Sequence, residues 1–419
     1  MLKNRIPLFI VVVLLALTNL ACVKEGCTDP EALNYNKSAE RDDESCRYGD
    51  KNVDLKADIL INHANIAFAL YSDAHTKAVA LKTASASFLD NPTKDGLDAL
   101  RQAWRTAHFY YLQGEALRFS SGPIDDEKGI DRQLDAWPIQ PALIDAVNGS
   151  YVGIVHDSTL IKTISSASIA QFNESKGEGQ ISTGFHVVEF LLWGKDSLNN
   201  SISNSGSRLF TDFSLTDPNV VNAKRRRQYL SAAIDLIVTQ LAILSSEWDI
   251  EGGSNYRSGF LNMDVDKALK LVLTGLGTLS GSEMADRALL LPVYSNDQSK
   301  EISTFSDNTY NDLIAMSNSL TIVYTGFYES ENTLAIEGSS LHDLAVILNN
   351  DLDLELTKEL DASSELITEI PQPFDWQISK ESQLTEGPIQ SAASSLSDLE
   401  RLIIELAREI GFGLQTELP

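Results

Sequence analysis

The sequence predicts an all-α fold that consists of two helical-bundle halves. Apolar residues recur at the three-and-four spacing of helices in several long segments, and no segment alternates apolar and polar residues as a half-buried strand does. The stretch 199–222 is rich in Ser, Asn and Asp and has little periodicity, so we expect it to connect the halves. The first half then covers about 51–198 and the second about 223–419.

Two segments show the helical spacing most clearly. The first follows the basic run 224–227, and the second lies near the C-terminus, where Ser397 and Glu400 have the spacing of a capping box and Gly411 is a helix stop. The apolar positions in the two segments are Leu230, Ala233, Ile234, Ile237, Leu241 and Leu244, and Leu396, Leu399, Ile403, Leu406 and Ile410. An irregular stretch, 294–308, interrupts the second half.

Length and charge limit the classes of function. With 419 residues, 43% of them hydrophobic, the chain can bury a large core without metal or disulfide cross-links. Asp and Glu number 59 against 33 Lys and Arg, which gives a formal net charge of −26. Such a charge repels phosphate backbones and anionic lipid headgroups. We therefore expect no nucleic-acid partner, and cations or neutral molecules as ligands.

The N-terminus has the features of a secretory signal peptide. Lys3 and Arg5 precede an apolar run over 8–17, which is too short to span a bilayer. The sequence Leu20-Ala21-Cys22 resembles the end of a bacterial lipobox, in which the cysteine is lipidated and becomes the first residue, although Asn19 stands where that motif usually has Leu. We predict a signal peptide over 1–21, with ordinary cleavage nearby as the alternative. A lipidated Cys22 would anchor the protein to the outer membrane of a bacterial envelope, on its periplasmic or surface side, and would be its only membrane attachment.

The cysteine count agrees with this prediction. The chain has three cysteines, and lipidation of Cys22 leaves the pair Cys27 and Cys46. The segment between them resembles a short, disulfide-closed acidic loop of secreted Bacteroidetes proteins, and such a cross-link can stabilise by roughly 3 kcal/mol. We expect a tether over 22–50 that contains this loop. It either binds calcium or is a solvated acidic loop without an ion, and its oxygen donors are Asp29, Asn34, Asn36, Asp42 and Asp43.

The clearest candidate for a functional site is the segment 184–194, with the sequence Gly-Phe-His-Val-Val-Glu-Phe-Leu-Leu-Trp-Gly. His186 and Glu189 are three residues apart and share one helix face, and their neighbours from Phe185 to Trp193 are apolar. Burial of an imidazole and a carboxylate costs several kcal/mol unless they have partners. The pair is therefore either a hydrogen bond that fixes helix packing or the centre of a ligand site.

This segment resembles the signature of the imelysin family, whose core is Gly-x-His-x-x-Glu. The resemblance extends in family order from about residue 54 to the C-terminus, with Thr304 and Tyr310 standing where the family typically has Cys and His. The other matching pieces are Trp104, Gly114-Glu115, Arg118-Phe119, Gly122-Pro123 and Asp135-Ala136-Trp137-Pro138 upstream, and Gly275-Leu276-Gly277, Glu283-Met284-Ala285, Arg287, 301–309 and Tyr324-Thr325-Gly326 downstream. The resemblance implies two helical halves with the signature at their interface, a place in the bacterial envelope and a link to iron. It also implies a historical grouping with metallopeptidases.

The sequence does not support peptidase activity. None of the six histidines is followed by Glu, so the His-Glu-x-x-His motif of zinc peptidases is absent. No Gly-x-Ser-x-Gly elbow occurs, and all cysteines lie in the N-terminal segment. We therefore do not expect an enzyme. A metallohydrolase that uses His186 and Glu189 remains an alternative, as does a surface protein that holds a peptide or glycan.

Metal binding without proteolysis fits the sequence better. We expect His186 and Glu189 to form the site with further carboxylates, in a mixed set that suits iron, zinc or another divalent transition metal. The additional candidates are Glu115, Glu283 and Asp307, with Arg118, Arg287 and Trp137 supporting the pocket. Each carboxylate also has an alternative role, because Glu115 and Glu283 can pair with Arg118 and Arg287 at helical spacing and Asp307 can cap a helix. The leading hypothesis is an envelope-anchored, metal-linked protein that serves iron acquisition, with a metal ion or small ligand as its partner.

The first prediction concerns the anchor. Replacement Cys22→Ser removes the only thiol that can carry the lipid, so the variant should move from the membrane to the soluble fraction. Fractionation followed by detergent partitioning measures this. If the variant partitions into detergent like the parent, the lipoprotein interpretation is wrong.

Overall fold

The computed structural model describes residues 23–30, 32–46, 49–125, 129–147, 149–177, 179–196, 205–384 and 386–417. The predicted signal peptide and Cys22 lie outside these ranges. The chain divides into two compact units, residues 1–53 and residues 54–419, and each is described by itself.

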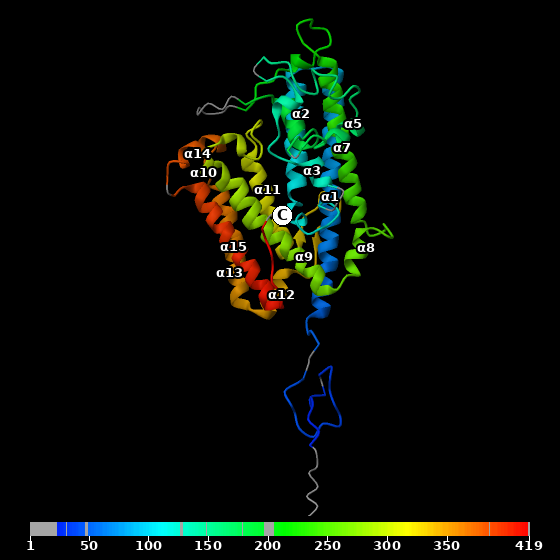
Figure 1. Ribbon diagram of the computed structural model, residues 1–419, viewed down its shortest axis with the longest axis vertical. Helices are drawn as coiled ribbons and strands as arrows, with labels where there is room; N and C mark the ends of the chain where they lie inside the picture. Colours follow the sequence, from blue (N-terminus) through cyan, green and yellow to red (C-terminus); the bar gives the residue numbers. More distant parts are fainter. Residues whose placement is uncertain are drawn as a thin grey trace, which may run out of the picture. The chain divides into compact units, whose positions relative to one another are not determined.

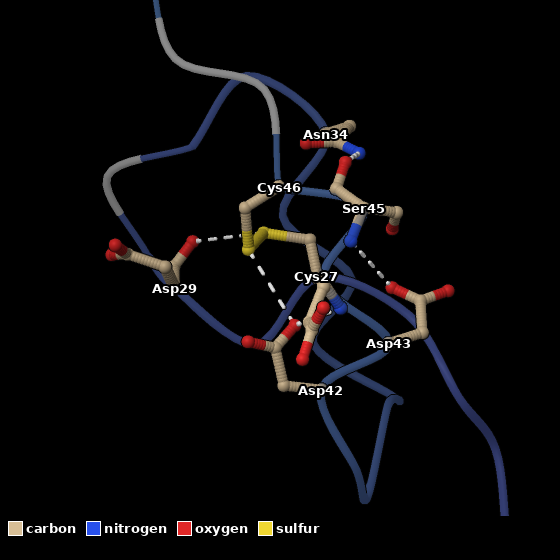
Figure 2. Close-up of a disulfide and its surroundings, with 8 residues drawn as sticks. Cys27, Asp29, Asn34, Asp42, Asp43, Ser45 and Cys46 are labelled. Atoms are coloured by element: carbon tan, nitrogen blue, oxygen red, sulfur yellow. Dashed lines mark hydrogen bonds between the residues drawn. A yellow bond between two sulfur atoms is a disulfide. The ribbon is translucent and has the colours of Figure 1, made fainter.

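The small unit contains the predicted disulfide between Cys27 and Cys46, whose Cα atoms are 4.6 Å apart (Figure 2). Its acidic side chains form local turns, because the carboxylates of Asp42 and Asp43 accept hydrogen bonds from the amides two residues later, at 3.3 and 3.0 Å. The groups of three or more His, Cys, Asp or Glu that converge among the described residues both lie in the large unit. A calcium ion in this loop stays a prediction.

The large unit confirms the all-α prediction (Figure 1). Its strands in the described ranges are the two-residue antiparallel pair β1 (Phe327–Tyr328) and β2 (Ile336–Glu337). The first-half helices are α1 (Val53–Asp90), α2 (Lys94–Leu112), η1 (Glu115–Leu117), α3 (Ile130–Leu134), α4 (Pro141–Ile144), α5 (Ser166–Phe172) and α6 (Phe185–Trp193). They are followed by η2 (Phe210–Phe213), α7 (Ala223–Glu247), α8 (Tyr256–Leu261), α9 (Val265–Thr278), η3 (Leu279–Leu290), α10 (Leu291–Ser295), η4 (Gln298–Lys300), α11 (Thr309–Thr325), α12 (Leu341–Leu348), α13 (Asn350–Thr368), α14 (Phe374–Glu381) and α15 (Pro388–Ile410).

The helices pack as two groups that meet at α2 and η1. In one group α7 packs against α3, α5 and α6, and in the other α15 packs against α9, η3 and α13 (Figure 1). The groups touch where α2 packs against α11 and where η1 packs against α9 and α11. The irregular stretch predicted over 294–308 contains the end of α10 and the short helix η4, and its remaining part, 301–308, leads into α11 at this junction.

The basic run 224–227 lies inside the first turn of α7, where positive charge opposes the helix dipole. Partners from the first half offset this cost, since Arg226 Nε lies 2.6 Å from Asp145 Oδ2 and Arg225 donates to the carbonyl oxygens of Ile154 and Ile161. By length and composition α7 is apolar enough to cross a membrane, but 56% of its most apolar window is buried in the protein. It is therefore a core helix of the bundle.

The capping box predicted at Ser397 and Glu400 is wrong. Helix α15 begins nine residues earlier, at Pro388, and Ser397 lies in its middle, donating to the carbonyl oxygen of Ala393 at 3.0 Å. Proline at the first helical position explains the start, because its fixed φ suits a helix and it lacks an amide that would need a partner. The predicted stop at Gly411 is confirmed by its left-handed φ of 114°.

Candidate metal centre

Helix α6, which carries the His-x-x-Glu signature, is buried along its whole length. It begins after Gly184, whose φ is 94°, and a Cβ at this position would lie 2.4 Å from the carbonyl oxygen of Leu134. Only glycine allows that turn and that close approach. The glycine of the signature thus fixes where α6 starts and which way His186 and Glu189 point.

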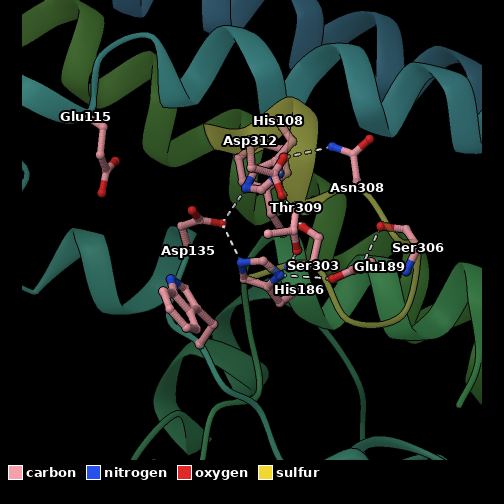
Figure 3. Close-up of polar contacts among 12 residues, drawn as sticks. His108, Glu115, Asp135, His186, Glu189, Ser303, Ser306, Asn308, Thr309 and Asp312 are labelled. Atoms are coloured by element: carbon pink, nitrogen blue, oxygen red, sulfur yellow. Dashed lines mark hydrogen bonds and ion pairs between the residues drawn. The ribbon is translucent and has the colours of Figure 1, made fainter. Parts of the chain in front are cut away.

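His186 and Glu189 form a fully buried pair. Their side chains are 2% and 0% exposed, and His186 Nδ1 lies 2.9 Å from Glu189 Oε2 (Figure 3). The other carboxylate oxygen, Oε1, accepts hydrogen bonds from the amides of Phe305 and Ser306, at 3.1 and 2.9 Å, and from the Ser306 hydroxyl at 2.7 Å. Both oxygens of Glu189 are therefore occupied, and the residue joins α6 to the segment 301–308.

A second buried histidine, His108 of α2, repeats this arrangement. Its Nδ1 lies 3.2 Å from Asp312 Oδ1 on α11, and its Nε2 lies 2.9 Å from Asp135 Oδ1 (Figure 3). Asp312 is held in turn by the Ser303 hydroxyl at 2.5 Å and by the Asn308 side-chain amide at 2.7 Å. Each imidazole therefore faces one carboxylate through Nδ1 and leaves Nε2 directed elsewhere.

Asp135 is the point on which the two imidazoles converge. His186 Nε2 lies 3.3 Å from the same Oδ1 that contacts His108, and the ligand atoms of all three residues lie within 4.8 Å of one another. Among the described residues, His186 Nε2 has no partner with hydrogen-bond geometry although it is buried. Two imidazole nitrogens and a carboxylate oxygen so arranged can hold a proton between them or a metal ion.

The charges of this group are coupled. Burial alone would lower the pKa of the His108 imidazole, but the carboxylates of Asp135 and Asp312 outweigh it and raise this pKa well above its usual value. Burial would likewise raise the pKa of Asp135, and His108 and His186 reverse the effect, so its pKa is lowered. The two carboxylates on either side of His108 therefore favour its protonated, imidazolium form.

The predicted carboxylates Glu115 and Glu283 lie outside this group and pair with arginines. Arg118 contacts Glu115, and Arg287 Nη1 lies 2.8 Å from Glu283 Oε1. Figure 3 shows Glu115 apart from the two histidines. Burial raises the pKa of Glu115 to about 7 although Arg118 opposes the shift. The ion pairs that the sequence offers as an alternative role are therefore both present.

The other predicted supporting residues lie near the centre. The guanidinium of Arg287 stacks 4.1 Å from the ring of Trp137 and also donates to its carbonyl oxygen. Trp137 and His186 line one cavity of about 320 Å³ with Phe305, so His186 is the member of the centre that faces open space. The predicted Asp307 groups instead with Asp196 and Asp375, in a cluster that contains neither histidine.

The sequence does not single out His108, Asp135 and Asp312. The helical spacing does give one indication for His108. It lies one turn after Trp104 on the buried face of α2, where an apolar residue is the usual choice, so a histidine there suggests a specific role. Asp135 belongs to the family-like Asp-Ala-Trp-Pro piece but has no local pattern that indicates a ligand. Only the packing of α2, α6 and α11 reveals that these residues meet.

The second prediction concerns the His108 pair in the presence of a chelator. Because the pKa of folded His108 is raised, its stabilisation is complete below the unfolded pKa of about 6.5 and is lost as pH rises toward the folded pKa. The difference in unfolding free energy between wild type and His108→Gln should be roughly 3 to 5 kcal/mol near pH 6. It should fall by about 1.4 kcal/mol per pH unit above about 6.5. Denaturant unfolding at pH 6 and 8 measures it, and an equal difference at both pH values would contradict the imidazolium assignment.

Comparison with known proteins identifies the family. The imelysin family model matches residues 67–403. Iron-regulated protein A of Synechococcus elongatus is 24% identical over 348 residues, which cover 81% of this chain and 83% of that protein.

Two crystal structures share the fold. One, described as an iron-regulated protein A precursor from Parabacteroides distasonis, has a TM-score of 0.67 and 21% identity and covers 86% of this chain and 96% of its own. The other, an imelysin-like protein from Psychrobacter arcticum, has a TM-score of 0.60 and 16% identity and covers 88% and 99%. The chain belongs to the imelysin family.

Proposed function

We propose that this protein binds a divalent transition metal in the bacterial envelope, through His108, Asp135 and His186, and that it serves iron acquisition. One observation carries the proposal. Two buried imidazoles direct Nε2 at the same carboxylate oxygen, at 2.9 and 3.3 Å, while a second carboxylate lies at each Nδ1. Metal-binding histidines are usually oriented in this way, with the second ring nitrogen on a carboxylate or carbonyl.

The donor set indicates the kind of metal. Two imidazoles and one carboxylate form the set that non-haem Fe(II) sites use, and zinc accepts the same donors. A metal ion here would take the place of the proton that His108 carries, so binding would release protons. In this proposal His108, Asp135 and His186 are ligands, and Glu189 and Asp312 orient the two rings.

This assignment differs in part from the set proposed from the sequence. Glu189 has both oxygens engaged, so it serves better as the residue that fixes the His186 ring than as a ligand or as a general base for hydrolysis. Glu115 and Glu283 are balanced by arginines and would need to break ion pairs in order to coordinate. A hydrolase that relies on the His186–Glu189 pair therefore gains no support from this geometry.

The link to iron rests on the relatives. Two of the similar proteins are described as iron-regulated protein A or its precursor. The predicted lipid on Cys22 would hold the protein at the outer membrane, where an iron-acquisition protein has access to the metal. The net charge of −26 favours the approach of cations over that of anions.

The third prediction concerns metal content. After iron, zinc or manganese is supplied, wild type should retain metal and show a melting temperature that chelator lowers. His186→Ala should lose the metal, and Glu189→Gln should bind about 10- to 100-fold more weakly, because it only orients the ligand. Affinity should also weaken below about pH 6, since neutral imidazole is the binding form. Elemental analysis and melting curves with and without chelator measure these effects.

The matched control is His75→Ala, a histidine of α1 that contacts none of the proposed ligands. It should keep the metal content of wild type. No metal in wild type, or unchanged metal in both His186→Ala and Glu189→Gln, would rule out the proposed site. If His186→Ala then lowers stability alone, the pair is purely structural.

A further inference from the structure

A second cavity, of about 350 Å³, lies at the end of α6 beside two buried arginines. Arg208 precedes η2 and Arg226 lies in the first turn of α7, and their side chains are 7% and 6% exposed. The cavity is also lined by Trp193 and Gly194 and by the segment 219–221, which leads into α7. Buried positive charge therefore borders one cavity of a protein whose formal net charge is −26.

A single buried carboxylate, that of Asp145, balances both arginines. It accepts hydrogen bonds from Nε and Nη2 of Arg226 at 2.6 and 3.1 Å, and Nη1 of Arg208 lies 3.0 Å from its Oδ2. Nη1 of Arg226 donates to the carbonyl oxygen of Asp212 at 2.8 Å, so every guanidinium nitrogen of Arg226 is engaged. The carboxylate of Asp212 lies 3.8 Å from Arg208 and is 39% exposed, which weakens its effect through solvent screening.

Arg208 has two guanidinium nitrogens left for another partner. Its Nη1 faces Asp145, but Nε is buried and donates no hydrogen bond to the residues that the structure describes. Nη2 likewise has no hydrogen bond or ion pair with those residues. Nε and Nη2 form one edge of the planar guanidinium, and such an edge can donate two parallel hydrogen bonds to a carboxylate. Native proteins rarely leave a buried N–H without an acceptor, so this edge indicates a ligand.

The surroundings of Arg208 agree with this interpretation. Gly194, whose φ is 74°, borders its Nε with backbone alone, and a Cβ at that position would lie 3.7 Å from Nε. Burial lowers the pKa of Arg208, Asp145 opposes this shift, and the positive charge of Arg226 adds to it. An anion at the unpaired edge would therefore stabilise the charged form of Arg208.

We propose that this cavity binds the carboxylate group of a small organic acid, with its two oxygens on Nε and Nη2 of Arg208. Two guanidinium charges against one buried carboxylate leave a single positive charge, which favours a singly charged ligand over a phosphate monoester. Tyr151, Trp193 and Val220 also line the cavity and would contact the rest of the molecule. A volume of about 350 Å³ lies within the range of small-molecule sites.

This site goes beyond the proposed metal centre and does not depend on it. The residues that line the cavity include none of the three proposed metal ligands, whereas His186 lines the other cavity. The protein would then bind an organic acid through arginine and a metal through histidine at two separate places.

The fourth prediction tests the site with acetate, butyrate and benzoate. Isothermal titration of the full mature chain with Cys22→Ser should show that at least one of them binds at a single site, and added salt should weaken binding. Arg208→Lys keeps the charge but loses the edge with two donors, so it should bind at least tenfold more weakly. Asp212→Asn removes a negative charge beside the guanidinium and should bind several-fold more tightly. A gain of affinity cannot come from damage to the fold.

Three controls complete the experiment. Benzamide, the neutral analogue of benzoate, should not bind. Arg401→Lys changes an arginine on α15 whose side chain is 60% exposed, and it should bind like the parent, as should His186→Ala. The proposal is overturned if none of the three carboxylates binds at millimolar concentration or if inorganic phosphate binds more tightly than all of them. It is also overturned if Arg208→Lys binds as tightly as Arg401→Lys, or if Asp212→Asn gains no affinity.

Discussion

The contact between Glu189 and the segment 301–308 is the interaction on which the rest of the structure depends. A carboxylate on the fully buried helix α6 receives two backbone amides and a hydroxyl from the second half of the chain. Breaking such a buried, hydrogen-bonded charge costs several kcal/mol. The contact of His108 Nδ1 on α2 with Asp312 Oδ1 on α11, at 3.2 Å, is a second link between the two helical groups. Because amides satisfy a carboxylate only at well-defined distances and angles, these contacts permit one relative placement of the two helical groups.

That placement also determines what the centre can do. Glu189 and Asp312 each engage an Nδ1 atom, so both rings are fixed with Nε2 toward Asp135. The same carboxylates that stabilise a protonated His108 would increase the basicity of the rings toward a metal. In the proposed metal site, a proton and a metal ion would therefore be alternatives for one buried position. The contacts that join the two helical groups are the same contacts that would orient the ligands of the proposed site.

The sequence predicts the fold and one side of the centre because both depend on local patterns. Helical spacing is visible within single segments. The His-x-x-Glu pair can be recognised because its two ionisable residues lie in an otherwise apolar run. The partners of that pair could not be found in this way, since His108 and Asp135 come from 78 and 51 residues upstream of His186 and touch it only after packing. Asp307 was expected beside His186, but with a positive φ of 53° it lies with Asp196 and Asp375. Ser397 and Glu400 fail as a capping box for a related reason, because the same spacing also occurs inside a helix whose start is set by Pro388.

Anomalous diffraction from crystals of the iron-loaded protein tests the central claim most directly. The account predicts a single strong peak at the iron edge between His108 Nε2, His186 Nε2 and the Asp135 carboxylate, with bond lengths of about 2.0–2.2 Å, as observed for similar donors on zinc. Glu189 and Asp312 should still contact the Nδ1 atoms of the two rings. Iron located elsewhere, with His108 and His186 still bonded to Asp135, would show that the centre is a structural ion-pair network and would contradict the claim.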